Sequence, residues 1–212
     1  MFHPLLRRHG LYAITDGPRR NLRAAAQAAL EGGAALLQYR DKTGDSRRRL
    51  HEARMLLELC ARFDVPLIIN DDVELARASG AAGVHLGEQD SDVASARAVL
   101  ADGAIIGVSC YDSLSRARDA AAAGADYLAF GAFFPSPTKP NARHATPELL
   151  RAAREFGKPL VAIGGVTPDN GGALIAAGAD FLAAISAVFA APDIRASARC
   201  FTDLFDATET VR

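Results

Sequence analysis

The chain has 212 residues, half of them hydrophobic and 23% charged, and its formal net charge is -1. These values are typical of a globular protein that is long enough to bury a full core. A charge balance this close to neutral argues against a nucleic-acid partner and against attraction to a membrane surface.

The three cysteines, Cys60, Cys110 and Cys200, lie far apart and form no CxxC pair. This spacing excludes a thiolate zinc cluster and fits a reducing compartment. The opening segment MFHPLLRRHG lacks the long apolar core of a signal peptide, and no apolar run reaches the roughly 18 residues of a membrane span. We therefore expect a cytoplasmic protein.

Short apolar segments alternate along the chain with longer amphipathic stretches. They begin about 17 to 33 residues apart, which is the spacing of βα units. Near-continuous apolar segments are typical of strands that are covered on both faces, as in a parallel sheet. In chain order the eight predicted strands are Leu11–Thr15, Ala35–Arg40, Pro66–Asn70, Gly83–Gly87, Ile105–Cys110, Tyr127–Phe133, Leu160–Gly164 and Phe181–Val188.

Short echoes of small residues precede several of these strands, as in Gly124-Ala125-Asp126 and Gly178-Ala179-Asp180. Repetition of one unit is the signature of a repeat-built fold. We therefore predict a single domain over residues 1–212, a parallel (β/α)8 TIM barrel. The alternative is an open doubly wound sheet, but no GxGxxG motif follows the first strand.

Two helical segments carry separate expectations. The basic run Arg47-Arg48-Arg49 opens a predicted helix, and we interpret it as a solvated helix face because basic runs matter only within a wider patch. The tail from Ala190 to Arg212 is expected to form a closing helix, which either packs on the barrel or joins copies of the chain in a homo-oligomer.

In this type of barrel the active site lies on the loops that follow the strands. Gln38, Arg40 and Lys42 alternate at the end of the second strand, so all three can point toward the barrel mouth. Burying two cations there is costly without a partner, and a pyrophosphate group is a suitable one. The alternative is that Arg40 and Lys42 pair with Asp41 or Asp45 at the loop surface.

Two carboxylates, Asp71 and Asp90, follow the third and fourth strands, which are expected to be neighbours. Two such groups can hold one Mg²⁺ that keeps other positions for water and phosphate oxygens. Asp72, in contrast, is expected to cap the helix that begins near Val73. The alternative for Asp90 is that it caps the helix that follows it.

The connection from Phe133 to Thr146 is long for an ordinary loop and contains Ser136, Thr138 and Lys139. Long loops in compact domains are often lids or binding segments. The alternative is a turn-rich surface loop without a role.

The seventh segment ends at Gly164-Gly165 and the eighth passes through Ile185-Ser186, and barrels often bind phosphate there through backbone N–H groups. His85 is interpreted as a packed, hydrogen-bonded histidine.

These segments occur together, and in the same order, in one family. They are Gln38–Lys42 (QYRDK), Ile69–Val73 (INDDV), Gly83–Gly87 (GVHLG) with Asp90, Gly107–Ser109 (GVS), Gly131–Lys139 (GAFFPSPTK), Ala162–Val166 (AIGGV) and Ile185–Ala187 (ISA). From about Leu11 to Phe189 the chain resembles the thiamine phosphate synthases, which are (β/α)8 barrels.

The resemblance implies a transferase that joins 4-amino-2-methyl-5-(diphosphooxymethyl)pyrimidine to a thiazole phosphate, giving thiamine phosphate and pyrophosphate. Pyrophosphate would leave first, assisted by Mg²⁺ (one per subunit), and the thiazole nitrogen would capture the pyrimidine methylene cation. The expected partners are therefore phosphorylated small molecules.

The resemblance also implies roles for individual residues. Arg40, Lys42 and Lys139 would be catalytic, and Asp71 and Asp90 would hold the metal. The pyrimidine diphosphate would be bound by Gln38, Tyr39, Arg40, Asp41, Lys42, Asn70, Ser109 and Lys139. The thiazole phosphate would be bound by Ser136, Pro137, Thr138, Gly165, Ile185 and Ser186. The chain departs from many family members at Ser136, which replaces Thr, and at Tyr111, which replaces His.

Two other functions stay open at this point. A thiazole tautomerase-like paralogue on the same barrel would need neither a pyrophosphate clamp nor a metal pair, so Arg40, Lys42, Asp71, Asp90 and Lys139 favour the synthase. A non-catalytic binder of thiamine precursors would bind its ligand without releasing pyrophosphate.

Overall fold

Eight parallel strands form a closed barrel in chain order, with β8 hydrogen-bonded to β1. This computed structural model describes residues 6, 8–135 and 143–209. The closure confirms the predicted (β/α)8 barrel and excludes the open doubly wound sheet. The strands are β1 Gly10–Ile14, β2 Leu36–Tyr39, β3 Leu67–Asn70, β4 Gly83–Leu86, β5 Ile105–Tyr111, β6 Tyr127–Phe130, β7 Leu160–Ile163 and β8 Phe181–Ala184.

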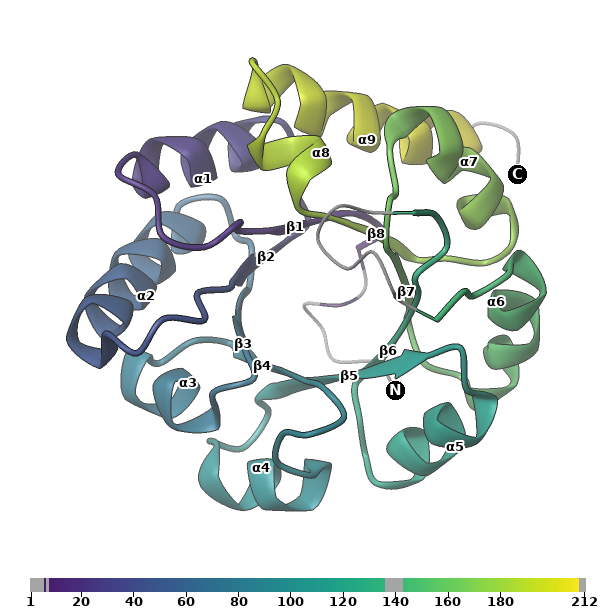
Figure 1. Cartoon of the computed structure of the whole chain (residues 1–212), viewed down its shortest axis with the longest axis horizontal. Helices are drawn as coiled ribbons and strands as arrows, with labels where there is room; N and C mark the ends of the chain where they lie inside the picture. The colour runs from purple at the N-terminus through teal and green to yellow at the C-terminus, as the bar shows by residue number, and fades with distance from the viewer. Residues whose placement is uncertain (1–5, 7, 136–142, 210–212) are drawn as a thin grey trace.

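The helices surround the ring of strands when the molecule is viewed down the barrel (Figure 1). They are α1 Leu22–Glu31, α2 Ser46–Ala61, α3 Val73–Ser79, α4 Val93–Val99, α5 Leu114–Ala122, α6 Pro147–Ala153, α7 Pro168–Ala176, α8 Ser186–Phe189 and α9 Ile194–Glu209, with a short 3₁₀ turn at Arg154–Phe156. Helix α9 packs against α1, α7, α8 and β1, as expected for a closing helix. Within the described ranges, no helix combines the length and the apolar character that a membrane crossing requires.

Two apolar layers hold the barrel together, because neighbouring strand residues point to opposite faces. Leu36 and Ile68 lie in the barrel interior, in a buried cluster with Ile105, Tyr127 and Phe181. Their chain neighbours, such as Leu37 and Ile69, belong to the layer between strands and helices. Covering both faces explains why each strand is a nearly continuous apolar segment.

The predicted boundaries are wrong by more than one residue at two strands. The eighth strand was expected to continue to Val188, but β8 ends at Ala184 and the short helix α8 begins at Ser186. The sixth was expected to reach Phe133, but β6 ends at Phe130. A short apolar run cannot distinguish a buried strand from the buried turn of helix that follows it.

Acidic caps begin several helices and position the loops before them. The Asp72 side chain accepts a hydrogen bond from the Leu75 N–H, so it caps α3 as predicted. Helix α4 is capped by Asp92 instead of Asp90. Asp90 is therefore not the cap that the alternative interpretation assigned to it.

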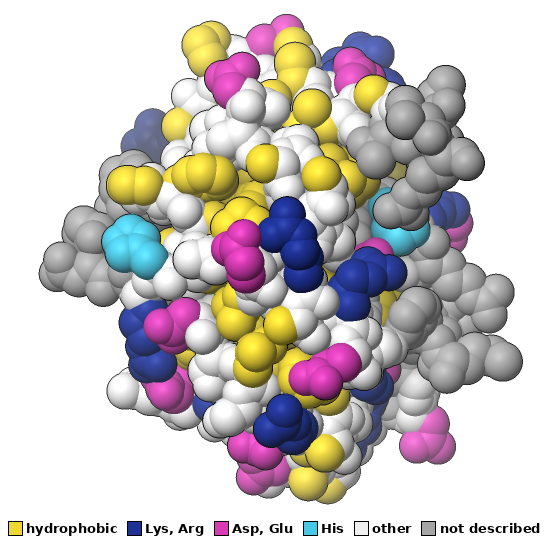
Figure 2. All heavy atoms as spheres, turned by 90° about the vertical axis from the view of Figure 1, so that its right-hand side faces the viewer, with side chains coloured by type: hydrophobic (Ala, Val, Ile, Leu, Met, Phe, Trp, Pro, Cys, Tyr) yellow, Lys and Arg dark blue, Asp and Glu magenta, His cyan; other side chains and the backbone are white. Residues whose placement is uncertain are grey.

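On the side of the barrel that Figure 2 shows, Lys and Arg side chains lie beside Asp and Glu side chains, with apolar groups between them. This face therefore carries charges of both signs and no field of one sign.

Candidate active site

A cavity of about 460 Å³ opens at the C-terminal ends of the strands. It collects most of the side chains that the sequence indicated, although they come from six different strand ends. The lining includes Gln38, Arg40, Lys42, Asn70, Asp71, Asp90, Ser109, Gly164, Gly165, Ile185 and Ser186. Ser136, Pro137, Thr138 and Lys139 lie outside the described residues.

The two cations of the β2 loop face this cavity. Lys42 Nζ lies 3.3 Å from an oxygen of Asp71, across the mouth on the neighbouring loop. Among the described residues, no carboxylate forms an ion pair with Arg40, whereas Asp41 and Asp45 both pair with Arg48. The alternative that Arg40 and Lys42 pair with Asp41 or Asp45 is therefore wrong. A half-buried guanidinium that faces a cavity is a site for an anionic ligand.

The two carboxylates expected to bind metal lie close together. Asp90 accepts a hydrogen bond of 2.6 Å from the Gly87 N–H. Burial raises the pKa of Asp90, the Gly87 N–H opposes this, and the nearby Asp71 carboxyl raises the pKa further. Such repulsion between two carboxylates is relieved when a cation binds between them. In the described part of the chain, no group of three or more His, Cys, Asp or Glu side chains could hold a metal.

The Asp71 backbone is held in an unusual conformation, with a φ of +64°. Non-glycine residues rarely adopt this left-handed region, and at functional sites the surroundings must maintain it. The Asp71 N–H donates to the His85 carbonyl at 2.8 Å, and the Asp72 N–H donates to the Asn70 carbonyl at 2.7 Å. These bonds fix the turn that aims the Asp71 carboxylate at the mouth.

Tyr39 and Asp41 were expected at the ligand, but the structure does not bring their side chains to the cavity. Because strand residues alternate, both point outward between β2 and α2. Tyr39 is 1% exposed and donates to Glu52 at 2.6 Å. Burial acts to raise the pKa of Asp41, but hydrogen bonds from Thr43 and Arg48 outweigh it and hold this pKa below its ordinary value.

A buried chain of hydrogen bonds crosses the floor of the cavity. Gln38 Nε2 donates to the Tyr12 hydroxyl at 2.8 Å, and the hydroxyls of Tyr12 and Tyr127 are also 2.8 Å apart. His85 contacts Tyr127 through Nδ1 and Ser109 through Nε2, each at 2.9 Å. We define Gln38, Tyr12, Tyr127, His85 and Ser109 as the floor network. It confirms His85 as a packed, hydrogen-bonded histidine.

The two tyrosines of the floor network were missed by the sequence analysis. A tyrosine at an inward-facing strand position could have indicated such a network, because a buried hydroxyl requires a polar partner. Burial raises the pKa of Tyr12 and Tyr127, so both hydroxyls stay protonated near neutral pH. The ring of Tyr127 fits only because Gly107 lies beneath it, where a Cβ atom would collide with that ring.

Arg143 was also missed, and it lines the cavity beside the loops that follow β4 and β5. It pairs with Glu88 at 3.0 Å and lies over the Tyr111 ring, 5.0 Å from the centroid. The sequence did not indicate this arginine, because its partners Glu88 and Tyr111 lie far from it in the chain, near the ends of two other strands.

The β7 and β8 side of the mouth is built mainly from backbone. Gly164 and Gly165 both have positive φ, +100° and +63°. The first residues of α8, Ser186 and Ala187, also line the cavity. The first N–H groups of any α-helix have no acceptor within the helix, so they are available to an anion.

Comparison with known proteins gives consistent matches along the chain. The family profile described as thiamine monophosphate synthase matches residues 11–188. A thiamine-phosphate synthase from Methylobacillus flagellatus is 52% identical over 206 residues, covering 96% of this chain and 99% of that protein. One from Azoarcus sp. is 56% identical over 199 residues, covering 92% and 97%.

A solved structure supports the same relationship. Thiamine phosphate pyrophosphorylase from Pyrococcus furiosus superposes with a TM-score of 0.87 at 35% identity, covering 96% of this chain and 98% of that one. The likeness therefore extends over the whole barrel.

Proposed function

The chain belongs to the thiamine monophosphate synthase family, and on that premise we propose that it joins a pyrimidine carrying a diphosphooxymethyl group to a thiazole phosphate. The products are thiamine phosphate and pyrophosphate. The observation that carries the proposal is the meeting of two cations, Arg40 and Lys42, with two carboxylates, Asp71 and Asp90, in one cavity.

This set of groups suits the departure of a diphosphate. Negative charge develops on the leaving group as its bond to the pyrimidine methylene breaks. Arg40 and Lys42 would neutralise that charge, and Lys139 would add a third cation. Losing one preorganised group of this kind costs about 10²–10³ in rate.

The reaction needs no strong general base, and the floor network agrees with that requirement. Both ring nitrogens of His85 already have hydrogen-bond partners, at 2.9 Å each. We assign the floor, with Gln38, Asn70 and Ser109, to orienting the pyrimidine. A floor whose polar groups are already hydrogen-bonded to one another would present no activated water to the methylene cation before the thiazole nitrogen reaches it.

The carboxylate pair fits Mg²⁺, which takes oxygen ligands and usually keeps several waters. Asp71 and Asp90 would hold the ion. When bound, the ion supplies positive charge to the diphosphate oxygens.

We assign the thiazole phosphate to the opposite side of the mouth. Gly165, Ile185 and Ser186 would bind it mainly through backbone groups, with Ser136, Pro137 and Thr138 completing the site. The two substrates would then face each other across the floor network.

The chemistry of the cysteines supports a reducing location, and we propose the cytoplasm. Cys60, Cys110 and Cys200 are all free. Burial raises the pKa of both the Cys60 and the Cys110 thiols to about 12, which leaves them protonated and unreactive at neutral pH.

The decisive test is pyrophosphate release by the purified protein, with both substrates, with each substrate alone, and with or without Mg²⁺. Thiamine phosphate would be identified by its mass. We expect release that requires both substrates and Mg²⁺. Full activity in excess chelator would refute the metal assignment.

A folded protein that releases no pyrophosphate would refute the proposed synthase. Isomerisation of a thiazole phosphate would then identify the tautomerase-like alternative. A thermal shift with thiamine precursors and no turnover would identify a binder.

A further inference from the structure

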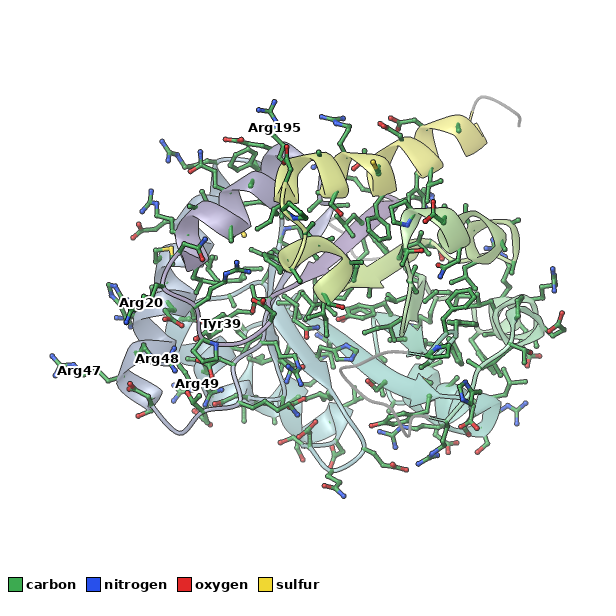
Figure 3. All side chains as sticks on the ribbon, turned by 45° about the horizontal axis from the view of Figure 1, so that its top comes forward. Arg20, Tyr39, Arg47, Arg48, Arg49 and Arg195 are labelled. Atoms are coloured by element: carbon green, nitrogen blue, oxygen red, sulfur yellow. The ribbon has the colours of Figure 1, made fainter. Side chains whose placement is uncertain are left out.

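The basic run at the start of α2 is not the solvated face that its sequence indicated. The Arg47 side chain extends away from the molecule, whereas Arg48 and Arg49 lie on the side of Tyr39 (Figure 3). The side chains of Arg48 and Arg49 are only 30% and 17% exposed. Each forms an ion pair with an aspartate that adjoins the candidate site.

Arg48 holds the loop that carries the two cavity-facing cations. Its guanidinium lies 2.7 Å from Asp41, whose side chain is fully buried. Asp41 stands between Arg40 and Lys42 in the chain. Because successive residues of an extended segment point to opposite sides, fixing Asp41 outward turns Arg40 and Lys42 toward the cavity.

Further bonds make this hold rigid. Asp41 accepts from the Thr43 N–H at 2.8 Å, and Arg48 donates to the Thr43 hydroxyl at 2.6 Å. Arg48 also donates to Glu52 at 3.1 Å, and Glu52 accepts from Tyr39 at 2.6 Å. We call Tyr39, Asp41, Thr43, Arg48 and Glu52 the loop anchor. None of these five residues lines the cavity.

Arg49 holds the next loop in the same way. Its guanidinium lies 3.1 Å from Asp72, the residue that caps α3 and follows Asp71. Holding Asp72 helps to maintain the left-handed backbone at Asp71. Neighbouring helix residues are rotated by about 100°, so adjacent arginines on one helix can reach two different loops. The 3.3 Å contact between Lys42 and Asp71 then joins those loops at the mouth.

We infer that Arg48 and Arg49 are positioning residues, Arg48 for the diphosphate cations and Arg49 for the metal carboxylate. The roles given to these two loops rest on the proposed function. Tyr39 and Asp41 thereby contribute to the site without contacting a ligand directly. Both arginines act through other side chains, so their effects should be selective for one ligand each.

The test compares Arg48→Gln and Arg49→Gln with Arg47→Gln, a matched control on the same helix. For Arg48→Gln we expect the KM of the pyrimidine diphosphate to rise about 10-fold, with the KM of the thiazole phosphate within about twofold. For Arg49→Gln we expect the Mg²⁺ concentration at half-maximal rate to rise about fivefold. Arg47→Gln should match the parent in all three values.

A double-mutant cycle separates positioning from general damage. In the Arg48→Gln background, the further change Asp41→Asn should alter the KM of the pyrimidine diphosphate by less than about twofold, because the ion pair is already broken. Arg48→Lys keeps a cation beside Asp41 and should lie between the parent and Arg48→Gln. If Arg48→Gln does not fold, Arg48→Lys is compared with the parent instead. A KM for the pyrimidine diphosphate equal to that of the parent would then overturn the role of Arg48.

Calorimetry with Mg²⁺ and inorganic pyrophosphate provides a readout that does not require turnover. Weaker binding by Arg48→Gln than by Arg47→Gln supports the inference even if the parent makes no thiamine phosphate. Equal binding, or a parallel change in both KM values, overturns it. An active parent with three indistinguishable Gln variants would leave the proposed function standing and remove the inference.

Discussion

The two sides of the barrel mouth, to which we assign the two phosphorylated substrates, differ in chemistry. The β2 to β4 side uses charged side chains. Arg40 and Lys42 are long and flexible, and the carboxylates of Asp71 and Asp90 lie close to each other. The β7 and β8 side uses glycine and the start of a helix. Flexible charged groups must be held in place from outside the cavity, whereas backbone groups are fixed already but leave no room for a side chain.

The two sides are therefore sensitive to different kinds of substitution. The charged side should fail when a charge or its support is removed. The backbone side should fail when atoms are added. A substitution that changes the charge of a side chain but keeps its shape tests the charged side. A substitution that adds atoms without changing the charge tests the backbone side.

The largest effect is expected at Asp71. Asp71→Asn removes the negative charge but keeps a residue type that tolerates positive φ. We expect turnover to fall by about 10²-fold or more while the melting temperature stays close to that of the parent. Pyrophosphate release and a thermal melt measure the two quantities. Activity within a few-fold of the parent would remove Asp71 from the metal site.

The second effect tests the backbone side. At Gly165, φ is +63°, and an added Cβ would lie 2.5 Å from the Pro135 carbonyl oxygen and 2.7 Å from the Phe134 Cβ. The backbone must therefore shift in Gly165→Ala. We expect the KM of the thiazole phosphate to rise about 10-fold and that of the pyrimidine diphosphate to stay constant.

Gly172→Ala is the matched control for this change. An added Cβ at Gly172, within α7, would meet nothing within 4 Å. Both KM values should be unchanged, and the free energy of unfolding should rise by about 0.5–1 kcal/mol. If the two alanine variants behave alike, the steric argument for the backbone side fails.

The third effect concerns the floor that both sides share. Tyr127→Phe deletes a hydroxyl that contacts both Tyr12 and His85. Leaving buried polar partners without a bond costs about 1–3 kcal/mol, so urea unfolding should show that loss of stability. The KM of the pyrimidine diphosphate should rise about threefold. No change in either value would show that the floor network is dispensable.

The smallest effect is a response to salt. Exposed charges are screened over about 8 Å at physiological ionic strength, and Lys42 is 60% exposed. Raising the salt concentration from low to physiological values should increase the KM of the pyrimidine diphosphate about twofold. The KM of the thiazole phosphate should change less. Equal responses would mean that both phosphate sites depend on long-range charge to the same degree.

Much of this architecture could be predicted because it rests on local patterns. All eight strands were found, since burial on two faces leaves a continuous apolar segment. The cap at Asp72 and the pair Asp71 and Asp90 follow from residue types at strand ends. The end of β8 could not be predicted, because Ile185 to Phe189 is as apolar as a strand while adopting a helical turn.

The support of the site could not be predicted, because it depends on side chains that are distant in the sequence. The sequence shows three equal arginines at the start of α2, and only packing distinguishes Arg47 from Arg48 and Arg49. The floor network likewise joins five strands, from Tyr12 to Tyr127. Spacing along the chain shows which groups reach the mouth but not what holds them there.

Closure of the barrel has a consequence for biosynthesis. One edge of β1 pairs with β8, from Gly10 opposite Phe181 to Ala13 opposite Ala184. Helix α9 packs against β1 and against the end of α1, where an added Cβ at Gly32 would lie 2.5 Å from Ala198, and Thr202 donates to the Gly32 carbonyl at 2.9 Å. The ribosome synthesises β8 near the end of the chain. The edge of β1 that pairs with β8 therefore stays open for most of synthesis. Such edges invite pairing with other chains. Until β8 pairs with β1, this edge therefore depends on a cell that keeps unfinished chains apart.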